Sequence, residues 1–136
     1  MPPQLIEKWK AEGRYAQEVK ELDEFFKRTG YPKAPRFYII KWLTDYITEF
    51  GIDGYRVDTV KQTEESVWKE FKTECNFAFE AYKKNNPKKV LDTTNFYLVG
   101  EVYNYAISHG KEFDLGDNKV NYFANASNSL INFELN

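Results

Sequence analysis

The sequence predicts an α/β fold with parallel strands, and three observations carry this prediction. The run 52–57 is rich in strand-forming residues and is followed by the acid Asp58. The run 96–100 is a second apolar stretch, and it is followed by Glu101. Between the two runs, residues 63–84 show the apolar spacing of one long helix. A strand, a helix and a strand in this order form a βαβ unit, whose strands are parallel and whose connection is right-handed.

Two helical stretches are predicted before the first strand. Residues 4–28 carry apolar side chains at helical spacing with charges between them, and Gly13 predicts a break. Residues 36–50 form a second helix whose apolar side chains cover more than half of its circumference, which predicts contacts on two sides. The remaining charged stripe of this helix is predicted to be solvated and consists of Arg36, Lys41 and Asp45.

The long helix between the two strands has a predicted start, core and end. Thr63 is a candidate N-cap with acids after it, and the run 85–87 ends the helix with a proline. Cys75 lies in mid-helix and is predicted to be a small core residue. The glutamates of this stretch are predicted to lie on its solvated face: Glu64, Glu65, Glu70, Glu74 and Glu80.

The chain beyond the second strand is predicted to be irregular from Tyr103 to about Asn121. It holds the only histidine, His109, which is predicted to be a solvated loop residue. The nearby acids lack the spacing of a calcium-binding loop and are read as loop residues. Residues 129–135 form a predicted third strand, and residues 120–123 before it fit a helix or a strand.

The two acids at the strand ends are the candidate functional residues. Alternation along the first strand places Arg56 on the same face as Asp58, where its charge can orient that carboxylate. If the strands are neighbours, Asp58 and Glu101 stand on strands about 4.8 Å apart. Glycosidases that retain stereochemistry hold two carboxyl groups roughly 5 to 5.5 Å apart. The spacing therefore fits that chemistry.

These residues carry a family resemblance. The stretches Gly51-Ile-Asp-Gly-Tyr-Arg-Val-Asp-Thr-Val-Lys61 and Val99-Gly-Glu-Val-Tyr103 resemble the nucleophile and acid/base motifs of the alpha-amylase family of glycoside hydrolases, which are (β/α)8 barrels. The resemblance implies one role for each matching residue: Asp58 as nucleophile, Arg56 as its positioning partner, Glu101 as general acid/base, and Lys61, Gln62 and Tyr103 as substrate contacts.

The resemblance also implies a larger fold and a reaction. Residues 1–136 would be the central part of a barrel, with its fourth to sixth strands and no separate second domain, whereas a closed barrel needs eight strands. The implied reaction is the retaining hydrolysis of α-glucosidic bonds, α-1,4 in starch-like glucans. Two family motifs, Asp-x-x-x-Asn-His and the Asn-His-Asp that holds a third catalytic aspartate, are not among these residues.

One position departs from the family pattern. Gln62 stands where the family usually has histidine after the lysine. Glutamine still donates a hydrogen bond to a sugar, although it cannot change its charge near neutral pH. No metal-binding side chain is predicted. The resemblance implies only a calcium contact in the complete family domain, through the backbone carbonyl of Gln62.

Composition excludes several other classes of protein. Hydrophobic residues make up 42% and charged residues 29% of the chain, so it is neither disordered nor a membrane span by composition. A net charge of −2 gives no reason to expect nucleic acid as a partner. The single cysteine excludes an internal disulfide. No signal peptide is predicted from the first residues, whereas the family resemblance favours an extracellular or periplasmic location. Oligomeric state is not predicted.

Three alternatives remain open at this point. The chain could be a non-catalytic relative of the barrel that binds sugars or partner proteins. It could be a truncated piece that is inactive alone, because three parallel strands leave two edges and one face uncovered. It could also be an unrelated α/β domain that carries both motifs by chance.

Overall fold

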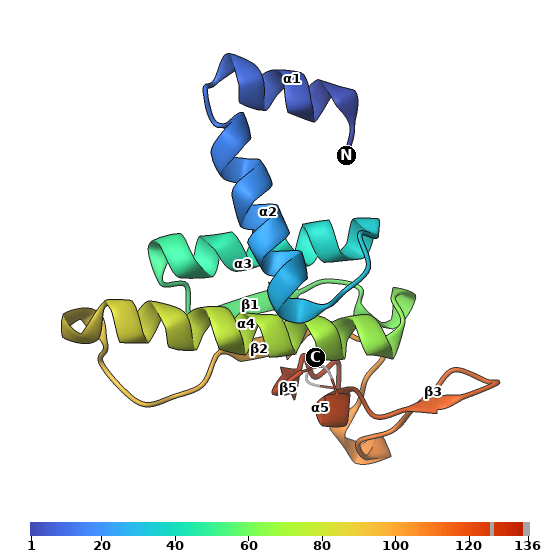
Figure 1. Cartoon of the computed structure of the whole chain (residues 1–136). Coiled ribbons are helices and arrows are strands. Elements are labelled where there is room, and N and C mark those ends of the chain that lie inside the picture. Colours follow the sequence, from blue (N-terminus) through green and yellow to red (C-terminus); the bar gives the residue numbers. More distant parts are fainter. Residues whose placement is uncertain (126, 135–136) are drawn as a thin grey trace. The chain divides into compact units, whose positions relative to one another are not determined.

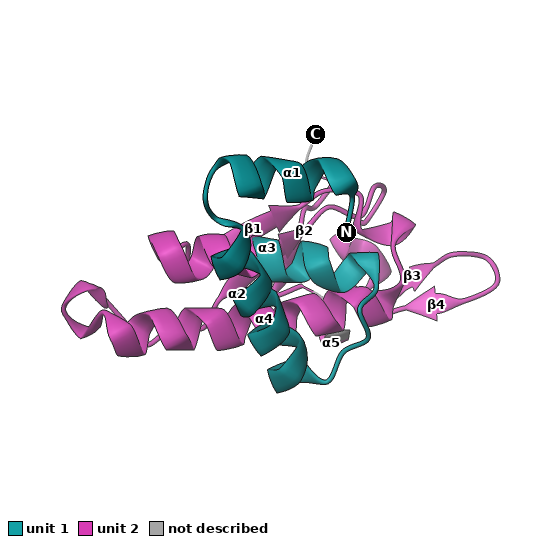
Figure 2. Ribbon diagram, turned by 45° about the horizontal axis from the view of Figure 1, so that its top comes forward, with its two compact units in different colours: residues 1–42 teal, residues 43–136 magenta. Residues whose placement is uncertain are grey.

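The computed structural model describes residues 1–125 and 127–134 as helices joined to a small parallel sheet (Figure 1). Contacts divide the chain into two compact units, Met1–Trp42 and Leu43–Asn136 (Figure 2). The elements in chain order are α1 Pro3–Ala11, α2 Tyr15–Thr29, α3 Pro35–Phe50, β1 Gly54–Val57, the 3₁₀ helix Val60–Gln62, α4 Glu65–Asn85, the 3₁₀ helix Pro87–Lys89, β2 Tyr97–Gly100, the 3₁₀ helix Ile107–His109, β3 Phe113–Asp114, β4 Lys119–Val120, α5 Tyr122–Asn125 and β5 Ser129–Leu130.

The first unit is built from α1, α2 and the first half of α3. The predicted break at Gly13 is confirmed, since this glycine has a φ of +70° between α1 and α2. The unit has an aromatic core: Trp9 meets Trp42 edge to face with ring centroids 6.3 Å apart, and Phe26 meets Tyr38 at 5.0 Å. Such contacts bury large apolar areas, so ring packing holds this unit together.

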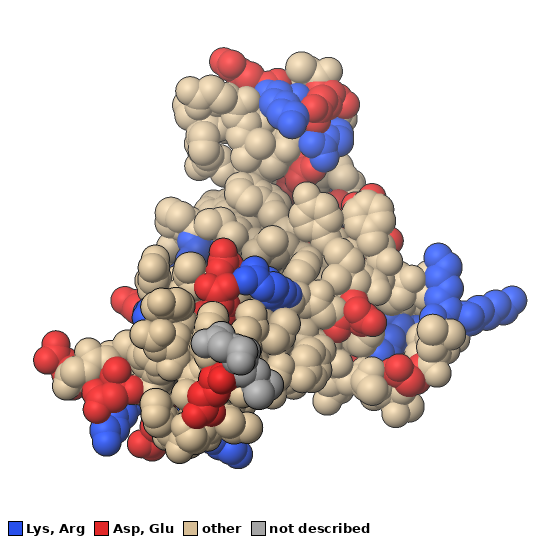
Figure 3. All heavy atoms as spheres, turned by 180° about the vertical axis from the view of Figure 1, so that it is seen from behind, with Lys and Arg blue, Asp and Glu red and all other residues tan. Residues whose placement is uncertain are grey.

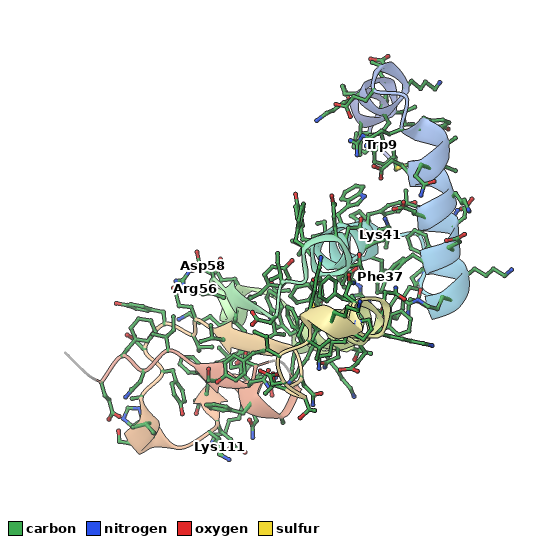
Figure 4. The ribbon with its side chains drawn as sticks, turned by 90° about the vertical axis from the view of Figure 1, so that its left-hand side faces the viewer. Trp9, Phe37, Lys41, Arg56, Asp58 and Lys111 are labelled. Atoms are coloured by element: carbon green, nitrogen blue, oxygen red, sulfur yellow. The ribbon has the colours of Figure 1, made fainter. Side chains whose placement is uncertain are left out.

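The predicted solvated stripe of α3 is wrong for Lys41. This lysine is only 4% exposed, and its Nζ donates a hydrogen bond to Glu21 Oε2 at 2.8 Å (Figure 4). Its aliphatic stem packs inside the unit while its charge is neutralised by a residue of α2. The hydrogen bond from Lys41 holds the pKa of Glu21 below its usual value.

Replacing Glu21 by Gln is expected to destabilise the protein at pH 7 by about 1 kcal/mol, because it removes the charged acceptor of the hydrogen bond from the buried Lys41 ammonium. The loss is modest because Glu21 itself is partly exposed to solvent. The pKa of Glu21 is lower in the folded protein than in the unfolded chain. The pair therefore stabilises the fold fully at pH values above the pKa of Glu21 in the unfolded chain, and this stabilisation is lost as the pH falls through the pKa of Glu21 in the folded protein. Urea unfolding followed by tryptophan fluorescence between pH 3 and pH 7 measures it.

The matched control is Glu24→Gln in the same helix. The Glu24 pair with Lys20 is long, at 3.9 Å, and exposed at both ends, so it contributes little. Equal losses of stability in the two variants, or a loss in Glu21→Gln that persists at pH 3, would contradict the buried pair as the cause.

The second unit contains the predicted parallel sheet. Its strand order is β1-β2-β5, and β1 pairs with β2 in parallel, with Val57 opposite Gly100. The third predicted strand is confirmed in position but is shorter: β5 ends at Leu130, and Leu135 lies outside the described residues. The prediction of an α/β fold with adjacent parallel strands is therefore confirmed.

Helix α4 covers one face of this sheet and runs along the strands (Figure 1). The ring of Tyr55 in β1 stacks on Phe71 of the helix with centroids 6.0 Å apart, and Phe79 meets Phe96 at 5.9 Å. Side chains alternate along a strand, so Arg56, the residue after Tyr55, points to the other face. The sheet thus has one face covered by α4 and a second face that carries Arg56.

Three details of α4 correct or confirm the sequence prediction. The N-cap is Glu64, which makes no capping hydrogen bond through its side chain, rather than Thr63. Glu74 is 5% exposed instead of solvated, whereas Glu64 and Glu80 are exposed as predicted. Cys75 is a fully buried free thiol, as predicted, and burial raises its pKa.

The stretch after β2 is less irregular than predicted. Strands β3 and β4 form an antiparallel pair, with Phe113 opposite Val120. The segment 120–123 is both strand and helix, since β4 ends at Val120 and α5 begins at Tyr122. The loops after β1 and β2 share a buried cluster with this region, formed by Val60, Val102, Tyr105, Val120 and Tyr122.

One face of the molecule shows no strong charge preference. On the face shown in Figure 3, acidic and basic side chains are interspersed and neither sign forms a large continuous patch. This agrees with the small net charge of −2. No helix in the described part of the chain has the length and apolar character needed to cross a bilayer.

Candidate active site

The two predicted acids stand at the same end of two paired strands. Val57 of β1 lies opposite Gly100 of β2, and each is followed directly by one of the acids, Asp58 and Glu101. Backbone hydrogen bonds continue past the strand ends: Glu101 N donates to Val57 O at 2.8 Å, and Val60 N donates to Glu101 O at 2.9 Å. The backbone therefore fixes the two acidic positions relative to each other.

The guanidinium of Arg56 lies between the two carboxylates. Its Nη2 atom donates a hydrogen bond to Glu101 Oε2. The same atom lies 3.8 Å from Asp58 Oδ1, and Figure 4 shows Arg56 and Asp58 close together. The side chain of Glu101 is 21% exposed, against 65% for Asp58. The sequence predicted the pairing of Arg56 with Asp58. The structure adds a closer contact with Glu101, so one cation orients both acids.

A cavity of about 370 Å³ opens beside Glu101. Besides Glu101, it is lined by Thr59 and by the three residues predicted as substrate contacts: Lys61, Gln62 and Tyr103. These side chains come from the 3₁₀ helix after β1 and from the loop after β2. The structure therefore gathers four of the six predicted site residues around one cavity, while Arg56 and Asp58 lie outside its lining.

Two neighbours of this cavity were not predicted from the sequence. Thr59 lines it and has a φ of +49°, in the left-handed region that a β-branched residue rarely adopts. Phe113 of β3 places its ring 5.4 Å from the Nζ atom of Lys61. A two-residue strand has no readable period, so the sequence held no local signal for this contact.

His109 and the acids near it do not join this site. His109 is exposed, as predicted, and lines a separate cavity of about 530 Å³ together with Glu112 and Asp114. Within residues 1–125 and 127–134, no group of three His, Cys, Asp or Glu side chains is arranged to hold a metal ion.

Comparison with known proteins gives several relatives among characterised proteins and among solved structures. No protein-family model matches the chain. A periplasmic alpha-amylase of Escherichia coli is 34% identical over 105 residues, which cover 77% of this chain and 14% of the relative. A cyclomaltodextrinase of Geobacillus thermopakistaniensis is 28% identical over 77% of this chain and 17% of the relative. A maltogenic alpha-amylase of Bacillus acidopullulyticus is 29% identical over 71% of this chain and 15% of the relative.

The structural comparison points the same way. The crystal structure of an Anoxybacillus alpha-amylase superposes with a TM-score of 0.51 and 25% identity, covering 73% of this chain and 17% of that one. The chain thus spans 14 to 17% of the length of these relatives. The resemblance predicted from the two acidic motifs is confirmed, and the chain is homologous to one segment of the alpha-amylase family.

Proposed function

We propose that this chain carries the nucleophile and the general acid/base of an enzyme that hydrolyses α-glucosidic bonds with retention, α-1,4 bonds of starch-like glucans in particular. One observation carries the proposal: Asp58 and Glu101 follow paired positions of adjacent parallel strands, and both contact the same nitrogen atom, Arg56 Nη2. Because one oxygen of each carboxylate contacts Arg56 Nη2, the distance between these two oxygens cannot exceed the sum of their distances to that atom. That range includes the carboxyl separation of about 5 to 5.5 Å found in retaining glycosidases.

The proposed reaction has two steps. In the first, an Asp58 carboxylate oxygen forms a bond to the anomeric carbon, the bond from that carbon to the leaving-group oxygen breaks, and the Glu101 carboxyl donates its proton to that oxygen. In the second, the Glu101 carboxylate takes a proton from water as the water oxygen attacks the anomeric carbon, and the ester bond to Asp58 breaks. Arg56 orients both carboxylates through its contacts with each.

The cavity beside Glu101 is proposed to hold the sugar on the leaving-group side of the bond. Tyr103 is 59% exposed and presents an aromatic surface on which a sugar ring can stack. Lys61 and Gln62 supply hydrogen-bond donors for sugar hydroxyl groups. Gln62 keeps its charge state at every pH, so we expect a donor whose strength does not vary near neutral pH.

A calcium contact through the backbone carbonyl of Gln62 remains a proposal for the complete family domain. Calcium takes six to eight oxygen ligands. The described residues offer no group of three acidic, His or Cys side chains that could hold a metal. The carbonyl of Gln62 would therefore be one ligand in a set supplied largely by other groups, and no reaction step above depends on it.

We further propose that the parallel strands β1, β2 and β5 are the fourth to sixth strands of a (β/α)8 barrel, within one domain that includes residues 1–136. The match to the Anoxybacillus alpha-amylase supports this, as does the uncovered sheet face away from α4, where Tyr97 is 51% exposed. In such a barrel, catalytic residues lie at the carboxyl ends of the strands, where Asp58 and Glu101 are.

The substrate and location are proposed from the relatives. The names alpha-amylase, cyclomaltodextrinase and maltogenic alpha-amylase favour an α-glucan or oligosaccharide as the partner of this site. A periplasmic or extracellular location is proposed because the Escherichia coli relative is a periplasmic alpha-amylase.

Covalent trapping tests the proposed nucleophile. Incubating the 136-residue chain with 5-fluoro-α-D-glucosyl fluoride is expected to give one glycosyl adduct per chain by intact mass, and peptide mapping is expected to place it on Asp58. Asp58→Asn removes the nucleophilic carboxylate and should give no adduct. Asp53→Asn is the matched control, because Asp53 is exposed at the opposite end of the same strand. An adduct on another residue, or a folded chain that forms no adduct, would contradict the assignment of Asp58 as the nucleophile.

A further inference from the structure

The ammonium group of Lys61 is held by three groups at the edge of the 370 Å³ cavity. Its Nζ atom lies 5.3 Å from the ring centroid of Tyr103 and 5.4 Å from that of Phe113, and it donates a hydrogen bond of 3.4 Å to the backbone carbonyl of Tyr103. A cation within about 6 Å of an aromatic face is attracted by the ring. Lys61 therefore has one ring from the loop after β2 and another from β3.

Phe113 is itself well anchored. It lies in β3 opposite Val120, whose side chain is only 5% exposed, and it packs against the buried cluster that contains Val60 and Tyr122. Its ring also lines the separate cavity of about 530 Å³ and is not part of the lining of the cavity beside Glu101. Phe113 therefore does not touch the cavity beside Glu101 itself, and its direct link to that cavity is the contact with Lys61.

We infer that Phe113 is a positioning residue, which holds the Lys61 ammonium at the cavity rim so that it meets a sugar hydroxyl group with little loss of side-chain freedom. This inference rests on the proposed binding of a glucan in that cavity. A lysine side chain has several rotatable bonds, and a preorganised donor binds more tightly than a free one. The two ring contacts are long, at 5.3 and 5.4 Å to the centroids, and act by electrostatic attraction. An ammonium has three N–H donors, so two remain for sugar oxygens after the bond to the Tyr103 carbonyl.

The first measurement needs no sugar. In the 136-residue chain, the ε-methylene protons of Lys61 should resonate upfield of those of exposed lysines, because the adjacent Nζ atom lies 5.3 and 5.4 Å from two ring centroids. Phe113→Leu should move these signals toward the exposed-lysine position, and Phe113→Tyr, which keeps the ring, should leave them in place. Leu115→Ala is the matched control, since Leu115 lies between β3 and β4 and is 44% exposed.

The second measurement is the binding of maltotetraose by calorimetry. Phe113→Leu is expected to raise the dissociation constant roughly two- to fivefold, as expected for loss of an exposed cation–ring contact, while Phe113→Tyr and Leu115→Ala leave it unchanged. Lys61 signals that stay in place in Phe113→Leu would overturn the inference, as would an unchanged dissociation constant. If the wild-type chain binds no maltotetraose, the proposed sugar site fails, whereas the lysine signals still report whether the Phe113 ring lies against Lys61.

Discussion

Replacing Glu101 by Gln is expected to lower the rate of maltotetraose hydrolysis by roughly 10²- to 10⁴-fold, which is the usual contribution of a general acid/base. Glutamine keeps the size of the side chain and can still accept the hydrogen bond from Arg56, so the loss reports the missing proton. Trapping by 5-fluoro-α-D-glucosyl fluoride should be much less affected, because fluoride leaves with little need for a proton. Reducing-sugar release and intact-mass labelling measure the two effects.

Glu112→Gln is the control for Glu101→Gln. Glu112 is an exposed acid that lines the other cavity of the second unit, so its replacement should change neither hydrolysis nor trapping. If Glu101→Gln hydrolyses maltotetraose at the wild-type rate, Glu101 is not the acid/base. Equal losses of hydrolysis and trapping would also contradict the assignment, since they would point to damage common to both substrates.

Replacing Gly100 by Ala is expected to destabilise the second unit by about 1 to 3 kcal/mol, the usual cost of overpacking a core. A methyl group at this position would lie 2.5 Å from Ser127 Oγ, 3.0 Å from Leu130 Cδ2 and 3.1 Å from Val60 Cγ2. Ser127 is only 2% exposed, so it has little room to move away. Urea unfolding monitored by circular dichroism gives the change in the free energy of unfolding.

A double-mutant cycle isolates the cause of that change. Ser127→Ala removes the closest atom, so the double variant Gly100→Ala/Ser127→Ala should be more stable than the sum of the two single effects predicts. Strict additivity of the two substitutions would show that the clash at Ser127 is not the source of the loss.

The parts of the fold that the sequence could predict are those with a strong local pattern. The apolar runs that precede Asp58 and Glu101 are strands, and the long periodic stretch between them is α4. Parallel pairing followed from that order of elements, and alternation placed Arg56 beside Asp58. The gathering of Glu101 with its neighbours around one cavity followed from the family motif rather than from periodicity.

The parts that the sequence could not predict depend on residues far apart in the chain. Lys41 looks like a solvated charge until Glu21, twenty positions earlier, comes to lie beside it. The contact from Arg56 to Glu101 joins two strands, and its existence depends on a register that no local pattern specifies. Phe113 reaches Lys61 from a strand too short to show alternation.

The hydrogen bonds that join the loops after β1 and β2 have a consequence for how the site is assembled. Because Val60 N and Glu101 N both donate across the strand ends, the two acidic positions belong to one cooperative piece of backbone. The entropy cost of bringing the two carboxylates together therefore falls on folding and not on substrate binding. Substituting the side chain at either position leaves these backbone hydrogen bonds in place. The amide protons of Val60 and Glu101 should therefore exchange with solvent equally slowly in Asp58→Asn, Glu101→Gln and the unaltered chain.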